Sequence, residues 1–140
     1  MDKTIPNILE PIDKKKANEC NAVVLAYVGD AVESLFVRTV LATHSTAKSH
    51  VLHVKASRIV NATSQSYRAK KVLDILNEDE LAIYRRAKNS KVHSSAKNAD
   101  ILDYMSATGL EAVYGYLYLT GETDRLMTIL EYTYNDIMEN

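Results

Sequence analysis

Apolar residues recur at helical spacing over most of the chain. The longest such stretch covers residues 21–43, and its centre from Val23 to Val32 is apolar on nearly every face. A helix that is apolar on nearly all sides belongs inside a domain, so we expect this one to be central. Shorter periodic stretches predict further helices over about 45–55, 57–76, 78–88, 98–119 and 122–138.

Capping residues mark several ends of these helices. Ser45 and Thr46 are expected to cap the second helix, because their hydroxyl oxygens can accept from free backbone amides. Asn77 followed by Glu80 is typical of a capping box at the start of the fourth helix. Residues 89–97 are small and polar, which predicts a loop before the fifth helix.

The composition favours an all-α domain. The 140 residues fit a single core and include only four Gly and two Pro. Both prolines, Pro6 and Pro11, precede residue 12, so nothing in the rest of the chain forbids helix. We expect residues 1–18 to be a loosely ordered lead-in and residues 19–140 to form one all-α domain.

The cysteine count and the hydropathy indicate a compartment. Cys20 is the single cysteine, which excludes an intramolecular disulfide and a cysteine zinc cluster and suits a reducing cytoplasm. No apolar run reaches membrane-spanning length, and the first residues lack the apolar core of a signal peptide. We therefore expect a soluble cytoplasmic protein that does not associate with membranes.

Two acidic residues lie among apolar and small residues of the two longest predicted helices. Asp30 follows a glycine in the first long helix, and Glu111 lies between two glycines in the 98–119 helix. A carboxylate buried without a partner is costly, and glycines let two helices approach closely. We therefore expect the two carboxylates to converge, where they would offer the ligands that a hard cation such as Mg²⁺ prefers.

A structural explanation of the same two acids stays open. An Arg side chain or a Tyr hydroxyl could neutralise or satisfy each carboxylate, and the chain has nine Tyr. On spacing alone the structural explanation is the more frequent one, because perturbed buried acids often have no catalytic role. The pattern proposes a carboxylate metal site without deciding between the two.

The segment from Tyr84 to Lys97 is basic and contains no acid, although the net charge of the whole chain is −1. Cations and amides of this kind contact nucleic-acid phosphates. The candidates are Arg85, Arg86, Lys88, Asn89, Lys91, Lys97 and Asn98. A solvated helix end is the alternative, since cations are favoured at helix C-termini. A second cluster, Arg68, Lys70 and Lys71, is expected to be a solvated face.

Two of these segments resemble the acidic helices of the ribonuclease III endonuclease domain. Residues 25–32, Leu-Ala-Tyr-Val-Gly-Asp-Ala-Val, resemble the family's signature helix, in which a Gly-Asp-Ala step presents a catalytic Asp. Residues 108–119 are similar to its second acidic helix, and the resemblance covers roughly residues 20–135. Further matching segments are 37–38, 57–62, 86–91 and 97–100. The small size resembles mini-ribonuclease III, which lacks the double-stranded-RNA-binding domain of full-length enzymes.

The chain departs from full-length enzymes at three acidic positions. Those enzymes have acids where this sequence has Val23, Ala26 and Thr108. Mini-ribonuclease III shares the thinner pattern, so the departures favour that subtype and leave the number of bound metals open. Glu33, one turn after Asp30, could add an outer-shell acid, but we do not expect it to be a direct ligand.

The resemblance implies a ribonuclease III endonuclease-domain-like helical bundle with a defined activity. Asp30 and Glu111 would be the catalytic residues and would hold Mg²⁺, which Mn²⁺ could replace. The enzyme would cut double-stranded RNA and leave 5′-phosphate ends. It would act as a homodimer through Tyr27, Val28 and Val32 of the signature helix. The implied cellular substrate is precursor 23S ribosomal RNA, with a ribosomal protein as a further partner.

Two non-enzymatic explanations remain. One is a catalytically weak or inactive helical module that binds RNA or assists ribosome assembly, which the thin acidic cluster motivates. The other is a structural helical dimer whose buried acids are satisfied by Arg and Tyr. Both predict that Asp30→Asn leaves RNA processing unchanged.

Overall fold

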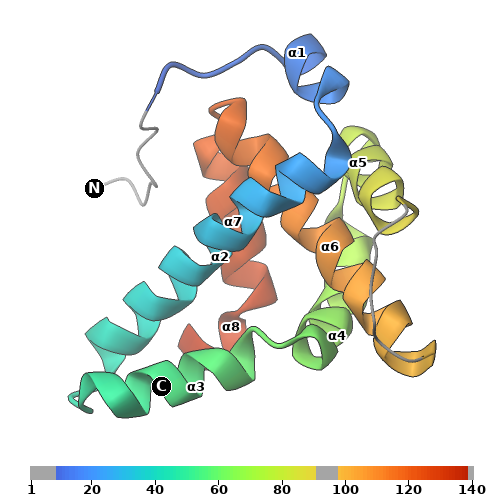
Figure 1. Cartoon of the computed structure of the whole chain (residues 1–140). Coiled ribbons are helices and arrows are strands. Elements are labelled where there is room, and N and C mark those ends of the chain that lie inside the picture. Colours follow the sequence, from blue (N-terminus) through green and yellow to red (C-terminus); the bar gives the residue numbers. More distant parts are fainter. Residues whose placement is uncertain (1–8, 91–97, 139–140) are drawn as a thin grey trace.

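The chain folds into helices packed around two long central ones (Figure 1). The computed structural model describes residues 9–90 and 98–138, and this part contains no β-strand, so the predicted all-α fold is confirmed. The helices are α1 (Lys14–Glu19), α2 (Ala22–His44), α3 (Ser49–Ile59), α4 (Ala62–Val72), α5 (Glu78–Lys88), α6 (Asn98–Leu119), α7 (Thr123–Thr133) and α8 (Asn135–Met138), with a 3₁₀ turn η1 (Leu73–Ile75) after α4.

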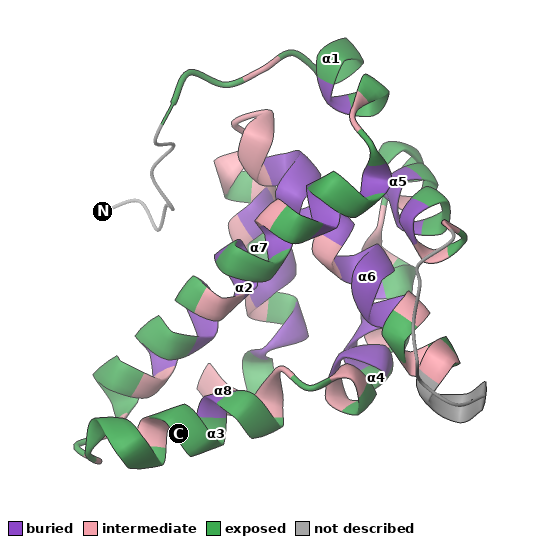
Figure 2. Ribbon diagram, in the orientation of Figure 1, coloured by how far each residue is buried: buried purple, intermediate pink, exposed green. Residues whose placement is uncertain are grey.

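Helices α2 and α6 cross at the centre of the molecule (Figure 1). Helices α4 and α5 pack on α6, while α3 packs on α2. Buried residues follow α2, α6 and α7, whereas α3 is exposed along most of its length (Figure 2). The largest side chains that are fully buried include Tyr114, Tyr116 and Tyr134, so tyrosine rings fill much of the core.

Glycines bring the backbones of α2 and α6 into contact. A Cβ atom on Gly29 would lie 1.6 Å from the carbonyl oxygen of Glu111, and one on Gly115 would lie 1.9 Å from that of Leu25. No side chain fits in either place, because such distances are far below van der Waals contact. The crossing therefore requires glycine on both helices, as the glycines beside the two acids led us to expect.

Several predicted boundaries are confirmed and others are wrong. The helices over 21–43, 78–88 and 98–119 are present almost as predicted, and Asn77 and Glu80 form the expected capping box. The predicted 57–76 helix is broken, because the Asn61 side chain accepts from the amide of Ser64 and caps α4. The predicted last helix is likewise split at Tyr134, between α7 and α8.

The second helix starts later than its expected caps. Helix α3 begins at Ser49, with Lys48 at the capping position and no side-chain cap. Ser45 Oγ accepts from the amide of Ala47 at 3.1 Å, a local turn that satisfies the amide outside a helix. Thr46 is exposed in the same linker.

The stretch expected to be a loose lead-in contains a short helix. Asp13 caps α1 by accepting from the amide of Lys16, and Ala17 is fully buried. Arg86 holds the other end, where its guanidinium donates to the carbonyls of Asn18 at 2.7 Å and Cys20 at 3.0 Å. Residues 1–8 lie outside the described part, and a boundary between residues 18 and 19 stays a prediction.

Among the residues that the structure describes, none of the helices has the length and apolar character needed to cross a membrane.

Candidate metal centre

Asp30 and Glu111 meet beside the α2–α6 crossing, where they line one open cleft. The cleft has a volume of about 310 Å³ and is lined by Val23, Ala26, Tyr27, Asp30, Tyr104, Thr108 and Glu111. Asp30 is exposed and Glu111 is half-buried, so both can be reached from solvent. The expected convergence of the two carboxylates is therefore observed, and backbone contact between their helices fixes it.

The structure adds a third carboxylate that the sequence left undecided. One oxygen from each of Asp30, Glu33 and Glu111 lies within 4.8 Å of the other two. Glu33 is fully buried behind the pair. Its Oε1 accepts from Gln65 Nε2 at 2.6 Å, and its Oε2 accepts from the hydroxyl of Tyr134 at 2.5 Å.

The pKa values of both glutamates in this cluster are raised. Burial raises the pKa of Glu33 to about 7, and the charge of Asp30 adds to this effect. The hydrogen bonds from Tyr134 and Gln65 and the charge of Arg68 oppose it without reversing it. Burial, the contact with Asp30 and the charge of Glu33 together raise the pKa of Glu111 far above its usual range. Such shifts are typical of carboxylates that share a site and have no cation.

The cluster has the chemistry of a divalent-cation site. None of the three acids forms an ion pair with Lys or Arg within residues 9–90 and 98–138. Clustered carboxylate oxygens that open to solvent are the ligands of Mg²⁺ and Mn²⁺, and such a cation would remove the repulsion among them. The residues present therefore fit a hard divalent cation.

The predicted RNA-binding residues have different surroundings. Arg85 and Asn89 are exposed at the end of α5, and Lys88 Nζ lies 6.0 Å from the centre of the Tyr84 ring. Arg86 is exposed too, but its guanidinium is occupied by the two carbonyls at the end of α1. Lys91, Lys97 and the side chain of Asn98 lie outside the described part of the chain.

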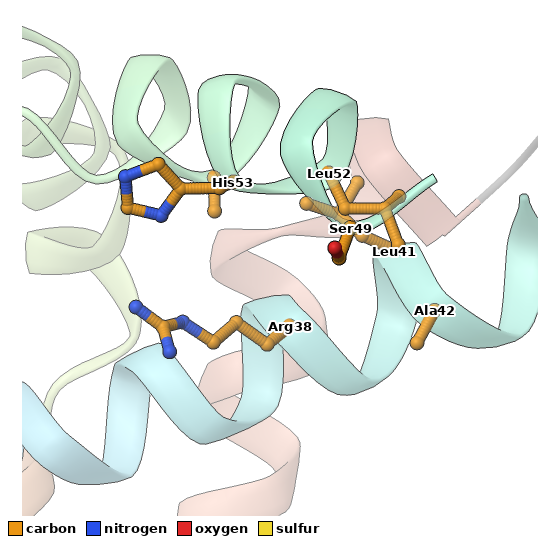
Figure 3. Close-up of a pocket in the computed structure, with 7 residues that line it drawn as sticks. Arg38, Leu41, Ala42, Ser49, Leu52 and His53 are labelled. Atoms are coloured by element: carbon orange, nitrogen blue, oxygen red, sulfur yellow. The ribbon is translucent and has the colours of Figure 1, made fainter. Parts of the chain in front are cut away.

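Sequence analysis missed a longer basic region. From Ser34 to Leu73 the chain carries seven of its 17 Lys and Arg residues and no acid, so the end of α2, α3 and α4 form a continuous basic region. A cleft of about 320 Å³ opens between α2 and α3. Figure 3 shows the Arg38 guanidinium and the His53 ring on opposite sides of its opening. Counting charge over 40 residues would have revealed this region.

The three predicted dimer residues differ in exposure. Tyr27 is 81% exposed and Val28 is half-buried, but Val32 is 5% exposed and belongs to the protomer's own core. Val32 is therefore a poor interface residue, because its side chain packs inward on the α2–α6 side. The exposed apolar face of α2 is formed instead by Val24, Tyr27, Ala31 and Leu35.

The described part of the chain is thus an all-helical domain in which carboxylates from two crossed helices converge on an open cleft and fit a divalent cation. Comparison with known proteins identifies the family. The family model "Ribonuclease III domain" matches residues 23–122, so the chain belongs to the ribonuclease III family. It is accordingly an endoribonuclease that acts on double-stranded RNA.

Similar proteins and a solved structure agree with this family. The chain is 41% identical over 127 residues to a mini-ribonuclease 3 of Clostridium tetani, covering 90% of this chain and 84% of that protein. It is 37% identical to a mini-ribonuclease 3 of a Thermoanaerobacter species, covering 99% and 100%. A crystal structure of a Fusobacterium nucleatum protein superposes with a TM-score of 0.73 at 28% identity, covering 84% of this chain and 94% of that one.

Proposed function

We propose that Asp30 and Glu111 are the catalytic residues and hold Mg²⁺, or Mn²⁺ in its place, for the cleavage of double-stranded RNA. The convergence of the two carboxylates at the mouth of one cleft is the observation that carries this proposal. A divalent cation held there supplies Lewis-acid stabilisation of the charge that develops on the scissile phosphate and an acidified water for the attack. Cleavage by water leaves a 5′-phosphate and a 3′-hydroxyl.

The chain's own residues contribute position and access. The glycine crossing fixes α2 against α6, so Asp30 and Glu111 stay aligned without relying on flexible loops. Asp30 is exposed and can therefore reach a phosphate that enters the cleft from solvent. Tyr104, at the rim of the cleft, is 42% exposed and can contact the ribose or the phosphate beside the cut.

Two copies of the chain would cut both strands of a duplex. We propose that they pair through the face of α2 formed by Val24, Tyr27, Ala31 and Leu35. These residues follow helical spacing and expose unusual apolar area, with Val24 52%, Tyr27 81% and Leu35 54% exposed. Tyr27 also lines the acidic cleft, so this pairing would bring the two sites near one another.

RNA would be held by phosphate contacts from two basic stretches of the chain. Arg85, Lys88 and Asn89, with Lys91, Lys97 and Asn98 after them, form one candidate surface, and the basic region 34–73 forms a second. Phosphate contacts recognise the shape of A-form RNA and not its sequence. We propose precursor 23S ribosomal RNA as the cellular substrate, presented with a ribosomal protein.

Cleavage assays with matched variants test the catalytic assignment. Wild type, Asp30→Asn and Glu111→Gln are incubated with a long labelled RNA duplex, with Mg²⁺, with Mn²⁺ or with EDTA. We expect wild type with a divalent cation to cut and leave 5′-phosphates, and both variants to lose at least about 1,000-fold in rate. Asp74→Asn is the control, because Asp74 is exposed in η1 and outside the cleft. Cleavage by Asp30→Asn at the wild-type rate would overturn the assignment.

A further inference from the structure

Glu33 is the one member of the acidic cluster that does not line the open cleft. It is fully buried, and each of its two carboxylate oxygens already accepts one short hydrogen bond, from Gln65 and from Tyr134. A carboxylate oxygen has a second lone pair, so both oxygens keep the capacity for another interaction. The Glu33 carboxylate is therefore fixed by two hydrogen bonds and can still interact with a further neighbouring group.

No Lys or Arg in the described part of the chain forms an ion pair with Glu33, although the charge of Arg68 lowers its pKa. The guanidinium of Arg68 donates to Asp136 Oδ1 at 2.8 Å and to the carbonyl of Thr133 at 2.8 Å. It also lies 4.3 Å from the centre of the Tyr134 ring, and it makes no ion pair with Glu33 in the described residues. The other groups that face Glu33 are Asp30, Glu111 and the hydroxyl of Tyr114.

Buried polar atoms without partners surround the same carboxylate. The hydroxyl of Tyr114 is fully buried and has no hydrogen-bond partner in the described part of the chain, and the same holds for Gln65 Oε1. Tyr114 follows Glu111 by one turn of α6, and the charges of both Glu33 and Glu111 raise the pKa of its hydroxyl. The nearby Thr133 hydroxyl donates instead to the carbonyl of Ile129 at 2.6 Å. Orphaned buried groups of this kind mark places where a water or an ion completes the network.

We propose that Glu33 is a positioning residue of the metal centre, which strengthens divalent-cation binding from behind Asp30 and Glu111 and anchors the centre to α4 and the α7–α8 junction. This inference rests on the proposed function of the Asp30–Glu111 pair. Glu33 supplies negative charge to the site and orients the hydration of the cation, while Gln65 and Tyr134 hold its carboxylate in place. Residues that support metal ligands in this manner change cation affinity when they are replaced.

A purely structural role makes the opposite prediction. If Glu33 served only to connect α2 with α4 and the α7–α8 junction, its replacement would lower the stability of the metal-free protein and leave cation affinity unchanged. Gln has the same shape and can keep a hydrogen bond with Gln65 and with Tyr134, while it removes the negative charge. Glu33→Gln therefore separates the charge from the packing.

Binding of Mn²⁺ to the RNA-free protein, measured by calorimetry or electron paramagnetic resonance, tests this proposal. We expect Glu33→Gln to weaken Mn²⁺ binding by about 10-fold or more without lowering the thermal midpoint of the metal-free protein. Tyr134→Phe removes one donor to the carboxylate and provides a second variant, with an expected loss of about threefold. Glu19→Gln, an exposed acid at the end of α1, is the matched control and should bind as wild type does.

The outcomes separate this inference from the proposed function. Absence of saturable Mn²⁺ binding by wild type would overturn the metal centre and this inference together. Binding that is lost in Asp30→Asn and unchanged in both Glu33→Gln and Tyr134→Phe would overturn the role of Glu33 alone.

Discussion

Glu80 and the acidic cluster are two sites among the described residues where carboxylates are buried, and they differ in what balances the charge. Glu80 is 1% exposed and receives hydrogen bonds from Arg125 at 2.7 and 2.8 Å and from the amide of Asn77 at 2.9 Å. Burial alone would raise the pKa of Glu80, but the bonds from Arg125 and Asn77 outweigh it and lower that pKa. In the cluster of Asp30, Glu33 and Glu111, no such cation is present among the described residues, and the pKa values of both glutamates rise.

The difference separates a structural acid from a functional one. Glu80 is balanced by Arg125 of the same chain, and the function of this ion pair is to join α5 to α7. Acids that repel one another in a cleft cost stability until a cation from solution binds them. Burial of a carboxylate therefore does not by itself identify a functional site, whereas burial without a balancing cation does.

We expect the largest effect from a substitution that separates α2 from α6, because their backbone contact holds the acidic cluster together. Gly29→Ala would place a Cβ atom 1.6 Å from the carbonyl oxygen of Glu111, so α2 and α6 must separate. We expect a loss of roughly 4 kcal/mol in the free energy of unfolding, measured with urea, together with loss of cleavage. The loss exceeds the gain of about 1 kcal/mol in helix propensity.

Gly109→Ala is the matched control for that substitution. Its Cβ atom would meet the Tyr84 ring at 2.9 Å and the carbonyl oxygen of Tyr84 at 3.0 Å, both far longer than the 1.6 Å contact at Gly29. Much smaller shifts relieve these contacts, so we expect a loss of about 1 kcal/mol. Equal losses for the two variants would show that the crossing tolerates separation and that the close backbone contact is not essential.

The sequence predicted the crossing but not the support behind it. The glycines beside Asp30 and Glu111 are a local signal, and so is the capping box of α5, because both depend on residues a few positions apart. The partners of Glu33 are not local: Gln65 is 32 residues away and Tyr134 is 101 residues away. Only the packing of α4 and the α7–α8 junction brings these side chains to α2, and no spacing rule encodes that.

Two predictions about surface residues did not take long-range contacts into account. Arg86 belongs to a basic segment, yet its guanidinium is used to hold α1, which lies 66 to 68 residues earlier in the chain. Val32 was expected at an interface because its helix is apolar on nearly every face, and the structure places it in the core. The apolar residues of α2 form one buried face and one exposed face, and tertiary packing decides which residues belong to each.

We expect the next largest effect from a substitution that removes the arginine of the Glu80–Arg125 ion pair. Arg125→Met leaves the Glu80 carboxylate buried with only the Asn77 amide as a donor. An uncompensated buried carboxylate is costly, so we expect a loss of about 3 kcal/mol in unfolding free energy. Mn²⁺ affinity should stay within twofold of wild type, because Arg125 does not line the acidic cleft. A fall in Mn²⁺ affinity that matches the fall in stability would mean that the two sites are coupled.

The pH dependence of the unfolding free energy gives a last comparison of the two sites. A carboxyl group whose pKa is raised by folding binds more protons in the folded protein than in the unfolded chain. Its contribution to stability is therefore full below the pKa of the unfolded chain and is lost as the pH rises through the pKa of the folded protein. For Glu33 this window runs from the ordinary value of 4.5 to about 7, and Glu111 continues it to higher pH. We expect the titration of Glu33 alone to lower the unfolding free energy of the metal-free protein by about 2 kcal/mol between about pH 5.5 and pH 8, with a further loss from Glu111, measured by urea unfolding in EDTA.

Divalent cations and one substitution should remove that loss. Mn²⁺ at about 100 times its dissociation constant would restore about 2.7 kcal/mol at pH 8, and less at pH 5.5, where protons occupy the carboxylates. Glu111→Gln removes one titrating acid, so its stability in EDTA should fall less steeply with pH and respond little to Mn²⁺. Glu80 has the opposite sign, because its lowered pKa makes stability fall only below about pH 4.5. A wild-type stability that is flat from pH 5.5 to pH 8 would show that the three acids are already compensated, and the contrast between the two sites would fail.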